Sequence, residues 1–431
     1  MTFNFISLIW IKDVTFIGLL LLSLYHTLYL LIFSQVFKKK FSLFNKALSW
    51  VILEWLRCEV IAVGSPFLSV GSAFSDFPVL TQISSIGGIH LISFWALLVV
   101  LLSLSFINNE SRKIKSLIPL LLLITIPYLY GVIKLNRNKP NPVTNPLHIS
   151  IIQPNISPEI KWSIETEKQQ LEIIKNLILN FSDNTDLLVL PETVFTYDYR
   201  SNLKVKGFLK NLTKNKNSMI LFGAIDDLSK NNVSYNGAFL LDQNLKLQSV
   251  YHKKNLVPFG EYIPFKKWMP EFECLTPIGD GFEAGNKLPY MNLTKNITTA
   301  PLICFEDCLS SFVRNVCHQD IDLILTITNN GWFRSIKGPL MLERLARFRA
   351  VENGVPLIRC ANTGVSSYID PYGRVLQRIE DKKRQFVNIS GVMNCKIYKK
   401  DKSRTIFSFI GYWWILALII VSYKNKLLQY R

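Results

Sequence analysis

Three separate stretches of the chain each place a reactive side chain just after an apolar run. The side chains are Glu192, Lys253 and Cys304, and the runs before them are 186–190, 247–251 and 300–303. Buried strands of α/β sheets deliver functional groups at their C-terminal ends. A carboxylate, an ammonium and a thiol there could act as general base, oxyanion-stabilising cation and nucleophile.

Cys304 lies in the sequence Leu302–Asp307, where an apolar strand pattern changes to helical spacing that continues to Val316. This change predicts a strand, a sharp turn and a helix, with the thiol near the helix N-terminus. The helix dipole would favour the thiolate at that place. A lone cysteine after a strand is more often a buried structural residue, so the functional interpretation depends on the other two stretches.

A second carboxylate, Glu261, follows Lys253 in a loop that contains Pro258, Gly260 and Pro264. A lysine that stays charged among apolar walls needs a nearby anion to offset its desolvation. We therefore expect Glu261 to pair with Lys253. Lys254 is the alternative lysine, because the apolar run alone does not decide which of the two points inward.

The composition indicates a membrane protein. Of 431 residues 49% are hydrophobic, the mean hydropathy is +0.22, and the formal net charge is +18. The lysines are scattered and no nucleic-acid-binding pattern is present, so a basic protein beside an anionic lipid surface fits better. The seven cysteines show no metal-ligand spacing, and we predict neither a metal site nor an essential disulfide.

Five segments are apolar enough to be considered as membrane spans, for which about 20 residues are needed. They are residues 14–37, 47–67, 90–107 and 116–133 in an N-terminal region, 1–135, and residues 406–423 near the C-terminus. The segment 47–67 contains Glu54, Arg57 and Glu59, and charges at membrane depth are costly unless they pair or face protein. An interfacial or re-entrant helix is the alternative for this segment.

The basic residues of the short loops predict the orientation. Lysines 38–40, the turn 112–115 and the C-terminal tail are basic, and all three fall on one side if four spans precede the large domain. By the positive-inside rule that side is the cytoplasm. The loop 64–88 has no Lys or Arg, as expected of an outer loop. Residues 134–405 then lie outside the cytoplasmic face.

Residues 148–398 have the pattern of one α/β domain. Predicted strands cover 148–153, 186–190, 219–224, 238–241, 247–251, 300–303, 322–328, 356–360 and 366–369, and predicted helices cover 164–180, 309–316 and 339–353. The strands are apolar throughout rather than alternating, so both faces of each sheet should be covered. This predicts a layered α/β architecture.

The order Glu192, Lys253, Cys304 resembles the Glu-Lys-Cys triad of the nitrilase, or carbon–nitrogen hydrolase, superfamily. The phrase LVPFGEYIP at 256–264 is more specific and closely resembles the membrane-bound branch, the apolipoprotein N-acyltransferases. The resemblance runs from about Trp50 to the C-terminal span. It includes residues 51–57, 86–88, 153–155, 161–162, 191–193, 251–253, 303–307, 329–333 and 361–366.

The resemblance implies a helical membrane bundle joined to an α/β nitrilase-like domain, an α-β-β-α sandwich. It implies Glu192 as general base, Lys253 as oxyanion lysine, Cys304 as nucleophile and Glu261 as the essential second glutamate. Around these groups it places Phe305 and Glu306 beside the nucleophile, with Trp162 and Trp332 in the surroundings of the active site. No cofactor or metal is implied.

The activity implied is transfer of an acyl chain from a phospholipid to the N-terminal S-diacylglyceryl-cysteine of a lipoprotein, through a cysteine thioester. The implied location is the bacterial inner membrane, with the catalytic domain on the periplasmic face, and we expect a monomer. Two alternatives stay open. One is a membrane-tethered amidase or nitrilase that acts on a small soluble substrate; the other is an inactive relative that binds lipoproteins.

The sequence departs from the family pattern at several positions. Phe305 stands where the family usually has Tyr, Asn330 where Asp is usual, and Met341-Leu342 where Gln-His is usual. The family also commonly has more spans before the catalytic domain than the four predicted here. The shortened membrane portion bears on lipid handling more than on the thiol chemistry.

Overall fold

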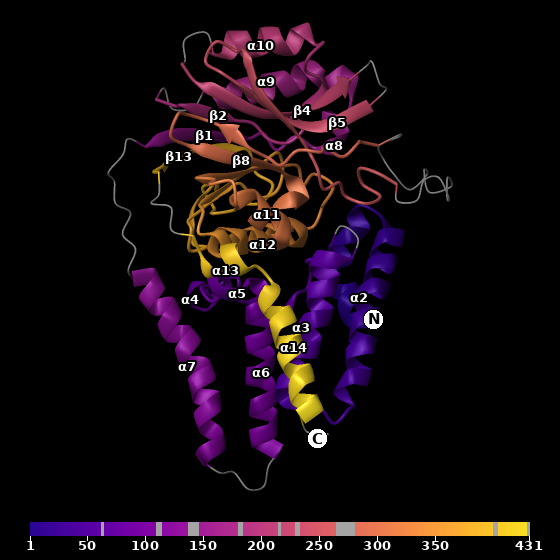
Figure 1. The fold of residues 1–431 in the computed structure, drawn as a ribbon. Coiled ribbons are helices and arrows are strands. Elements are labelled where there is room, and N and C mark those ends of the chain that lie inside the picture. Colours follow the sequence, from indigo (N-terminus) through magenta and orange to yellow (C-terminus); the bar gives the residue numbers. More distant parts are fainter. Residues whose placement is uncertain are drawn as a thin grey trace.

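Two parts, a layered α/β domain and a set of long apolar helices, make up the fold in the computed structural model (Figure 1). The structure describes residues 1–61, 64–108, 114–136, 146–179, 184–213, 217–228, 233–263, 281–399 and 404–428. The α/β domain lies above one end of the helices in Figure 1. The chain enters it after α7 and leaves it before α13.

The first sheet has the order β13-β1-β2-β4-β5-β6, with β3 paired to β4. Its strands are β1 Leu147–Gln153, β2 Leu187–Val189, β3 Phe195–Asp198, β4 Met219–Leu228, β5 Val233–Leu241, β6 Leu247–His252 and β13 Gly391–Ile397. The neighbours β1, β2 and β4 are parallel, whereas β4, β5 and β6 are joined antiparallel. The ends of β2 and β6 carry Glu192 and Lys253.

The second sheet has the order β12-β11-β10-β9-β8-β7. Its strands are β7 Met291–Asn292, β8 Thr298–Ile303, β9 Leu323–Thr328, β10 Leu357–Ala361, β11 Ser367–Ile369 and β12 Val375–Arg378. The central strands β8, β9 and β10 are parallel. Their shared direction brings Cys304, just after β8, to the same edge as the residues that follow β9.

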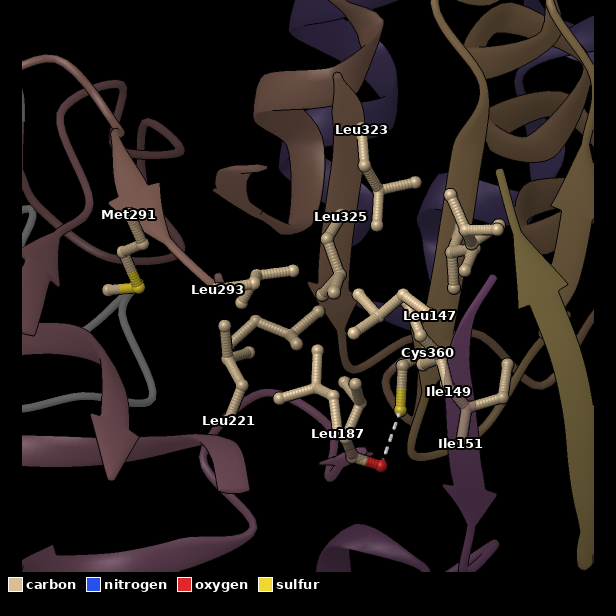
Figure 2. Close-up of a cluster of buried hydrophobic side chains, with 14 of the residues drawn as sticks. Leu147, Ile149, Ile151, Leu187, Leu221, Met291, Leu293, Leu323, Leu325 and Cys360 are labelled. Atoms are coloured by element: carbon tan, nitrogen blue, oxygen red, sulfur yellow. Dashed lines mark hydrogen bonds between the residues drawn. The ribbon is translucent and has the colours of Figure 1, made fainter. Parts of the chain in front are cut away.

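The two sheets pack face to face over a core of buried aliphatic side chains. Figure 2 shows this core, in which Leu187 and Leu221 of the first sheet lie near Leu325 and Cys360 of the second. Helices α9 Glu167–Ile178 and α10 Leu203–Thr213 cover the outer face of the first sheet, and α11 Ser310–Cys317 and α12 Lys337–Asn353 cover that of the second. The predicted α-β-β-α sandwich is confirmed.

The helical part has α1 Thr2–Ser7, η1 Ile9–Asp13, α2 Phe16–Phe37, α3 Leu43–Trp55, α6 Ile89–Asn108, α7 Ile114–Asn136 and α14 Trp413–Leu428. Within the described residues, three helical stretches are long and apolar enough to cross a membrane: Phe16–Phe37, Ile89–Asn108 and Leu117–Asn136. Their outward leucines and isoleucines are widely exposed. Such apolar faces match a lipid environment.

Two predicted helices differ in extent from the observed ones. The segment predicted over 47–67 forms α3 and a π-helical turn, Leu56–Val60, and the chain then turns at Gly64 with φ 84°. The segment predicted over 406–423 is two helices, α13 Ile406–Ile410 and α14, because Gly411 adopts φ 53° between them. Whether these segments cross the bilayer stays a prediction.

The loop predicted over 64–88 is partly helical. It contains the short helices η3 Val70–Phe74, α4 Pro78–Thr81 and α5 Ser84–Gly87. Strands β3, β7, β12 and β13 were also not predicted. Each of them is short or has partly exposed residues, so it lacks the continuous apolar run that marked the central strands.

The charges of α3 and its π turn have buried partners. Glu54 accepts hydrogen bonds from His90 (2.9 Å), Ser93 (2.5 Å) and the amide of Val70 (2.8 Å). Glu59 accepts from the backbone N–H of Ser311 in the catalytic domain at 2.9 Å. The charges that make 47–67 a weak span thus serve to pack helices together and to fasten them to the α/β domain.

Candidate active site

Cys304 sits in a strained turn at the end of β8. Its φ is 55°, in the left-handed region that side chains rarely occupy, and it begins a 3₁₀ turn that ends at Cys308. The buried carboxylate of Glu306 braces this turn: its Oε2 accepts from the backbone N–H of Ile303 at 2.9 Å. The geometry aims the thiol out of the strand at a fixed place.

Glu306 also ties the nucleophile turn to the lysine loop. Its Oε1 accepts from the hydroxyl of Tyr251 at 2.7 Å and from the backbone N–H groups of Lys254 and Asn255 at 2.9 and 3.0 Å. Glu306 is fully buried. The residue predicted to lie beside the nucleophile therefore holds together the two segments that carry Cys304 and Lys253.

Glu192 follows β2 and has both carboxylate oxygens occupied. Oε1 accepts from Asn236 Nδ2 at 2.8 Å, and Oε2 accepts from the backbone N–H of Asn329, just after β9, at 2.7 Å. The next residue, Thr193, has a φ of 43°, in the left-handed region. A Cβ at Gly223 of β4 would lie 2.5 Å from the Thr193 nitrogen and 2.6 Å from the Glu192 Cα, so this close approach requires glycine.

Lys253 and Glu261 form the expected pair. Lys253 Nζ lies 2.7 Å from Glu261 Oε2 and 2.9 Å from its Oε1, and 3.7 Å from Glu192 Oε1. The side chain of Lys253 is only 1% exposed. Asn236 Nδ2 donates to Glu261 Oε1 at 3.0 Å as well as to Glu192, so one amide links the two carboxylates that flank the ammonium.

The charges of the cluster shift one another's pKa values. Burial raises the pKa of Glu192, with the Lys253 charge opposing, so this carboxylate is more basic than an exposed one. For Lys253, burial acts to lower the pKa, but the charges of Glu261, Cys304 and Glu192 prevail and raise it. The ammonium therefore stays protonated, as an oxyanion-stabilising group must.

The expectation that the helix dipole favours the Cys304 thiolate is wrong for the resting site. Burial and the Glu192 charge raise the pKa of Cys304 to about 12, despite Lys253 and a hydrogen bond with Thr328. The following turn is a short 3₁₀ segment, so little dipole is available to offset desolvation. Any attack by this thiol requires a base that accepts its proton, and the Glu192 carboxylate lies close enough to act on the pKa of Cys304.

The remaining predicted site residues lie at different depths. Trp162 is 40% exposed and follows α8 Pro158–Lys161, whereas Phe305 and Trp332 are half-buried. The Phe305 ring lies 5.8 Å from that of Phe67, in the helical part. Lys254 is exposed. Only Lys253 of the two lysines therefore belongs to the buried cluster.

Aromatic side chains join the nucleophile turn to the N-terminal segment. The Trp10 ring lies 5.3 Å from Phe67 and 4.9 Å from Phe333, and Phe67 in turn contacts Phe305. We call these four residues the aromatic bridge. Beside it, the carboxylate of Asp13 accepts from the backbone N–H groups of the loop after Phe333 at 3.0 Å.

Three site residues were missed by sequence reasoning: Asn236, Lys161 and Arg359. Arg359 interrupts the apolar run of β10 and pairs with Asp307 inside the nucleophile turn, so that interruption was a usable signal. Asn236 is 2% exposed but stands in the polar first half of β5, before the apolar run 238–241. Lys161 stands between Ile160 and Trp162 at the end of the short helix α8 and interrupts no predicted strand.

Within the described part of the chain, no cluster of three or more His, Cys, Asp or Glu side chains could hold a metal ion. The groups brought together are instead a thiol, two carboxylates and an ammonium. Such a set can attack an acyl carbon, accept the proton of the thiol and stabilise an oxyanion.

The carbon–nitrogen hydrolase family model matches residues 148–390, which identifies the α/β part as a carbon–nitrogen hydrolase domain. The model of the apolipoprotein N-acyltransferase N-terminal domain matches residues 1–102. The chain belongs to the apolipoprotein N-acyltransferases, the acyltransferases of this superfamily. It is a membrane protein with its catalytic domain attached to apolar helices.

Curated apolipoprotein N-acyltransferases match along most of the chain. That of Rickettsia prowazekii is 32% identical over 86% of this chain and 73% of its own, and that of Rickettsia bellii is 33% identical over 88% and 74%. That of Aquifex aeolicus is 32% identical over 87% and 85%. Among solved structures, Saccharomyces cerevisiae Nit3, of the nitrilase superfamily, matches with a TM-score of 0.46 and 16% identity, over 63% of this chain and 96% of its own.

Proposed function

We propose that this enzyme transfers an acyl chain from a membrane phospholipid to the α-amine of an N-terminal S-diacylglyceryl-cysteine, through a thioester on Cys304. The observation that carries the mechanism is the buried cluster of Glu192, Lys253 and Glu261 around that thiol. The family relationship supports the lipoprotein acceptor. The apolar helices support substrates that reside in the bilayer.

In the first half-reaction the Cys304 sulfur attacks the ester carbonyl while Glu192 accepts the thiol proton. The carbonyl oxygen becomes an oxyanion, which the Lys253 ammonium and the backbone N–H of Phe305 stabilise. When the intermediate collapses, the carbon–oxygen bond of the ester breaks and Glu192 gives its proton to the leaving alkoxide oxygen, which becomes the hydroxyl of the lysophospholipid. Lysophospholipid departs and the acyl chain remains on sulfur.

In the second half-reaction the neutral α-amine attacks the thioester carbonyl. Glu192 accepts a proton from the attacking nitrogen, and the same cation and N–H stabilise the second oxyanion. Collapse breaks the carbon–sulfur bond, and the proton on Glu192 returns to the Cys304 sulfur. The product is an amide, and the enzyme regains its resting state.

The membrane arrangement belongs to the same proposal. We place the enzyme in the bacterial inner membrane as a monomer, with four spans before the catalytic domain, one after it, and the domain on the periplasmic face. The basic loops 38–40 and 112–115 support this orientation; residues 112 and 113 and the end of the C-terminal tail lie outside the described residues. The shape of Figure 1, with the domain at one end of the helices, is compatible with it.

Intact-protein mass spectrometry after incubation with phospholipid tests the thioester. Wild-type protein should gain the mass of one acyl chain, which hydroxylamine removes. Cys304→Ser should fold normally, because the change is small, and should lose transfer, because a hydroxyl is far less acidic than a thiol. Substantial turnover by Cys304→Ser would contradict the mechanism.

The acceptor is tested separately, by adding a diacylglyceryl-peptide with a free or an acetylated N-terminus to the acyl-enzyme. We expect release of the acyl chain to depend on the free amine. Equal release with both peptides would mean that water is the acceptor, and would favour the amidase alternative.

A further inference from the structure

Lys161 is a buried lysine that the mechanism above does not use. It ends α8 and is 2% exposed, and its Nζ donates a hydrogen bond to the backbone carbonyl of Glu192 at 2.9 Å. Two further bonds fix its backbone: its N–H donates to the Ser157 carbonyl at 2.8 Å, and its own carbonyl accepts from Gln170 at 3.2 Å. The turn therefore holds the Lys161 ammonium against the backbone of Glu192.

The charges of the cluster do not balance without this lysine. Glu192 and Glu261 are two buried carboxylates, and Lys253 is one ammonium, which lies closer to Glu261 (2.7 Å) than to Glu192 (3.7 Å). A buried charge without a counter-charge is strongly destabilising. With Lys161 protonated, Glu192 and Glu261 each have a neighbouring cation.

We propose that Lys161 is a positioning residue that acts through Glu192: its hydrogen bond holds the backbone at the end of β2, and its charge balances the second carboxylate. This balance holds during the attack, because the proton that leaves Cys304 only moves to Glu192. The negative charge that appears on sulfur, and then on the oxyanion, still has two cations nearby. The inference deepens the proposed function and rests on Cys304 as the reactive thiol.

The charge on Lys161 is sensitive to pH near neutrality. Burial lowers its pKa to about 7, although the charges of Glu192, after β2, and Cys304, after β8, act to raise it. Lys253 lies 3.7 Å from Glu192 and pairs with Glu261. As the pH rises through this pKa, Lys161 loses its proton and the cluster gains one net negative charge. That charge opposes the formation of a thiolate.

Alkylation of Cys304 by iodoacetamide, followed by peptide mass spectrometry on the full-length protein in detergent, measures this effect without any lipid substrate. The variants are Lys161→Met, Lys161→Gln and Lys161→Arg, with exposed Lys168→Met as matched control. Lys161→Met should alkylate about tenfold more slowly below pH 7, equivalent to about one pKa unit at the thiol. The Lys168 variant should match wild type.

The shape of the pH profile separates charge from hydrogen bonding. Wild type should show an inflection near the Lys161 pKa of about 7, above which alkylation rises less steeply with pH. Lys161→Arg keeps its charge and should lack this inflection. Lys161→Gln keeps a donor without the charge and should be as slow as Lys161→Met, with thermal unfolding confirming that it is folded.

A Gln variant with wild-type rate and profile would reduce Lys161 to a structural hydrogen bond and overturn the proposal. A Met variant that alkylates like wild type would do the same. These outcomes are independent of lipid turnover. If Cys304→Ser retained transfer, the proposed function would fail while the alkylation result would still stand.

Discussion

Lys253 and Lys254 are neighbours in the chain with opposite surroundings. Lys253 is buried between two carboxylates, whereas the side chain of Lys254 is exposed and only its backbone N–H, bonded to Glu306, faces the site. Adjacent residues of an extended strand end point to opposite sides. The same substitution, Lys to Met, can therefore be made at both positions, and the two variants differ only in whether the lost side chain pointed into the site or into solvent.

Lys253→Met should lower the rate of thioester formation by about 10²–10³, the typical cost of one oxyanion donor. Lys254→Met should stay within a few-fold of wild type, because its side chain touches no catalytic group. Single-turnover release of lysophospholipid measures both. A larger loss in the Lys254 variant would show that the assignment of the two lysines is reversed.

Glu261→Gln should slow thioester formation while leaving phospholipid binding little changed. The amide can still hydrogen-bond to Lys253, but the charge that raises the Lys253 pKa is lost. Burial then favours the neutral amine, which stabilises an oxyanion poorly. Rapid-quench measurement of acyl-enzyme against time tests this.

A different role for Glu261 gives a different time course. If the residue served only in transfer to the amine, the Gln variant would accumulate acyl-enzyme at the wild-type rate and then stall. A full-amplitude burst of that kind would contradict the charge-balancing role.

At the residue scale the clustering of Glu192, Lys253 and Cys304 could be predicted, and most of the residues that hold them could not. Glu192, Lys253 and Cys304 each follow an apolar run. In α/β proteins the functional groups lie at the carboxyl ends of such strands. Asn236 contacts both carboxylates, but it stands in the polar first half of β5, before the apolar run 238–241 that marked this strand in the sequence. Lys161 donates its hydrogen bond to the backbone carbonyl of Glu192, 31 residues away in the sequence, and no local pattern indicates such a contact.

At the scale of elements, β2 and β4 come so close that one glycine decides where Glu192 lies. A Cβ on Gly223 would meet backbone atoms of residues 192 and 193 at 2.5–2.6 Å, and backbone cannot rotate away as a flexible side chain can. Glu192, the proposed general base, is thus positioned by packing between strands as well as by its hydrogen bonds.

Gly223→Ala should reduce stability by about 1–3 kcal/mol, as overpacking typically does, and should displace Glu192 and lower thioester formation. Gly207→Ala is the matched control: a Cβ added at this position of α10 would meet nothing within 4 Å, and alanine favours a helix by about 0.5–1 kcal/mol. Denaturant unfolding and single-turnover assays measure both. An active, stable Gly223 variant would contradict this account.

Element boundaries were predictable where an apolar run was long and uniform. Strands β8, β9 and β10 and helix α12 lie within a few residues of the predicted ranges. The end of the helix in segment 47–67 could not be predicted. Its charged residues form buried hydrogen bonds with other elements, and the chain turns at Gly64. The same holds for the break at Gly411, which lies inside an apolar run.

At the scale of the whole molecule, the orientation in the membrane is the property to test. A cysteine introduced at Ser201, just before α10 of the α/β domain, should react with a membrane-impermeant maleimide in intact spheroplasts. A cysteine at Lys39, after α2, should react only after permeabilisation. Both native positions are exposed. The reverse pattern would place the catalytic domain in the cytoplasm and favour the amidase alternative.

The aromatic bridge fixes the reactive thiol against the helical part: Trp10 and Phe67 contact Phe333 and Phe305, next to Cys304. A nucleophile held beside a bilayer meets molecules that diffuse in two dimensions. For such an enzyme the quantity that sets the encounter rate is the mole fraction of each lipid in the surface, not its concentration in the volume. Adding inert lipid to a vesicle then slows the reaction although no molecule has been removed, and transfer within one small vesicle ends when its own lipoprotein is used up.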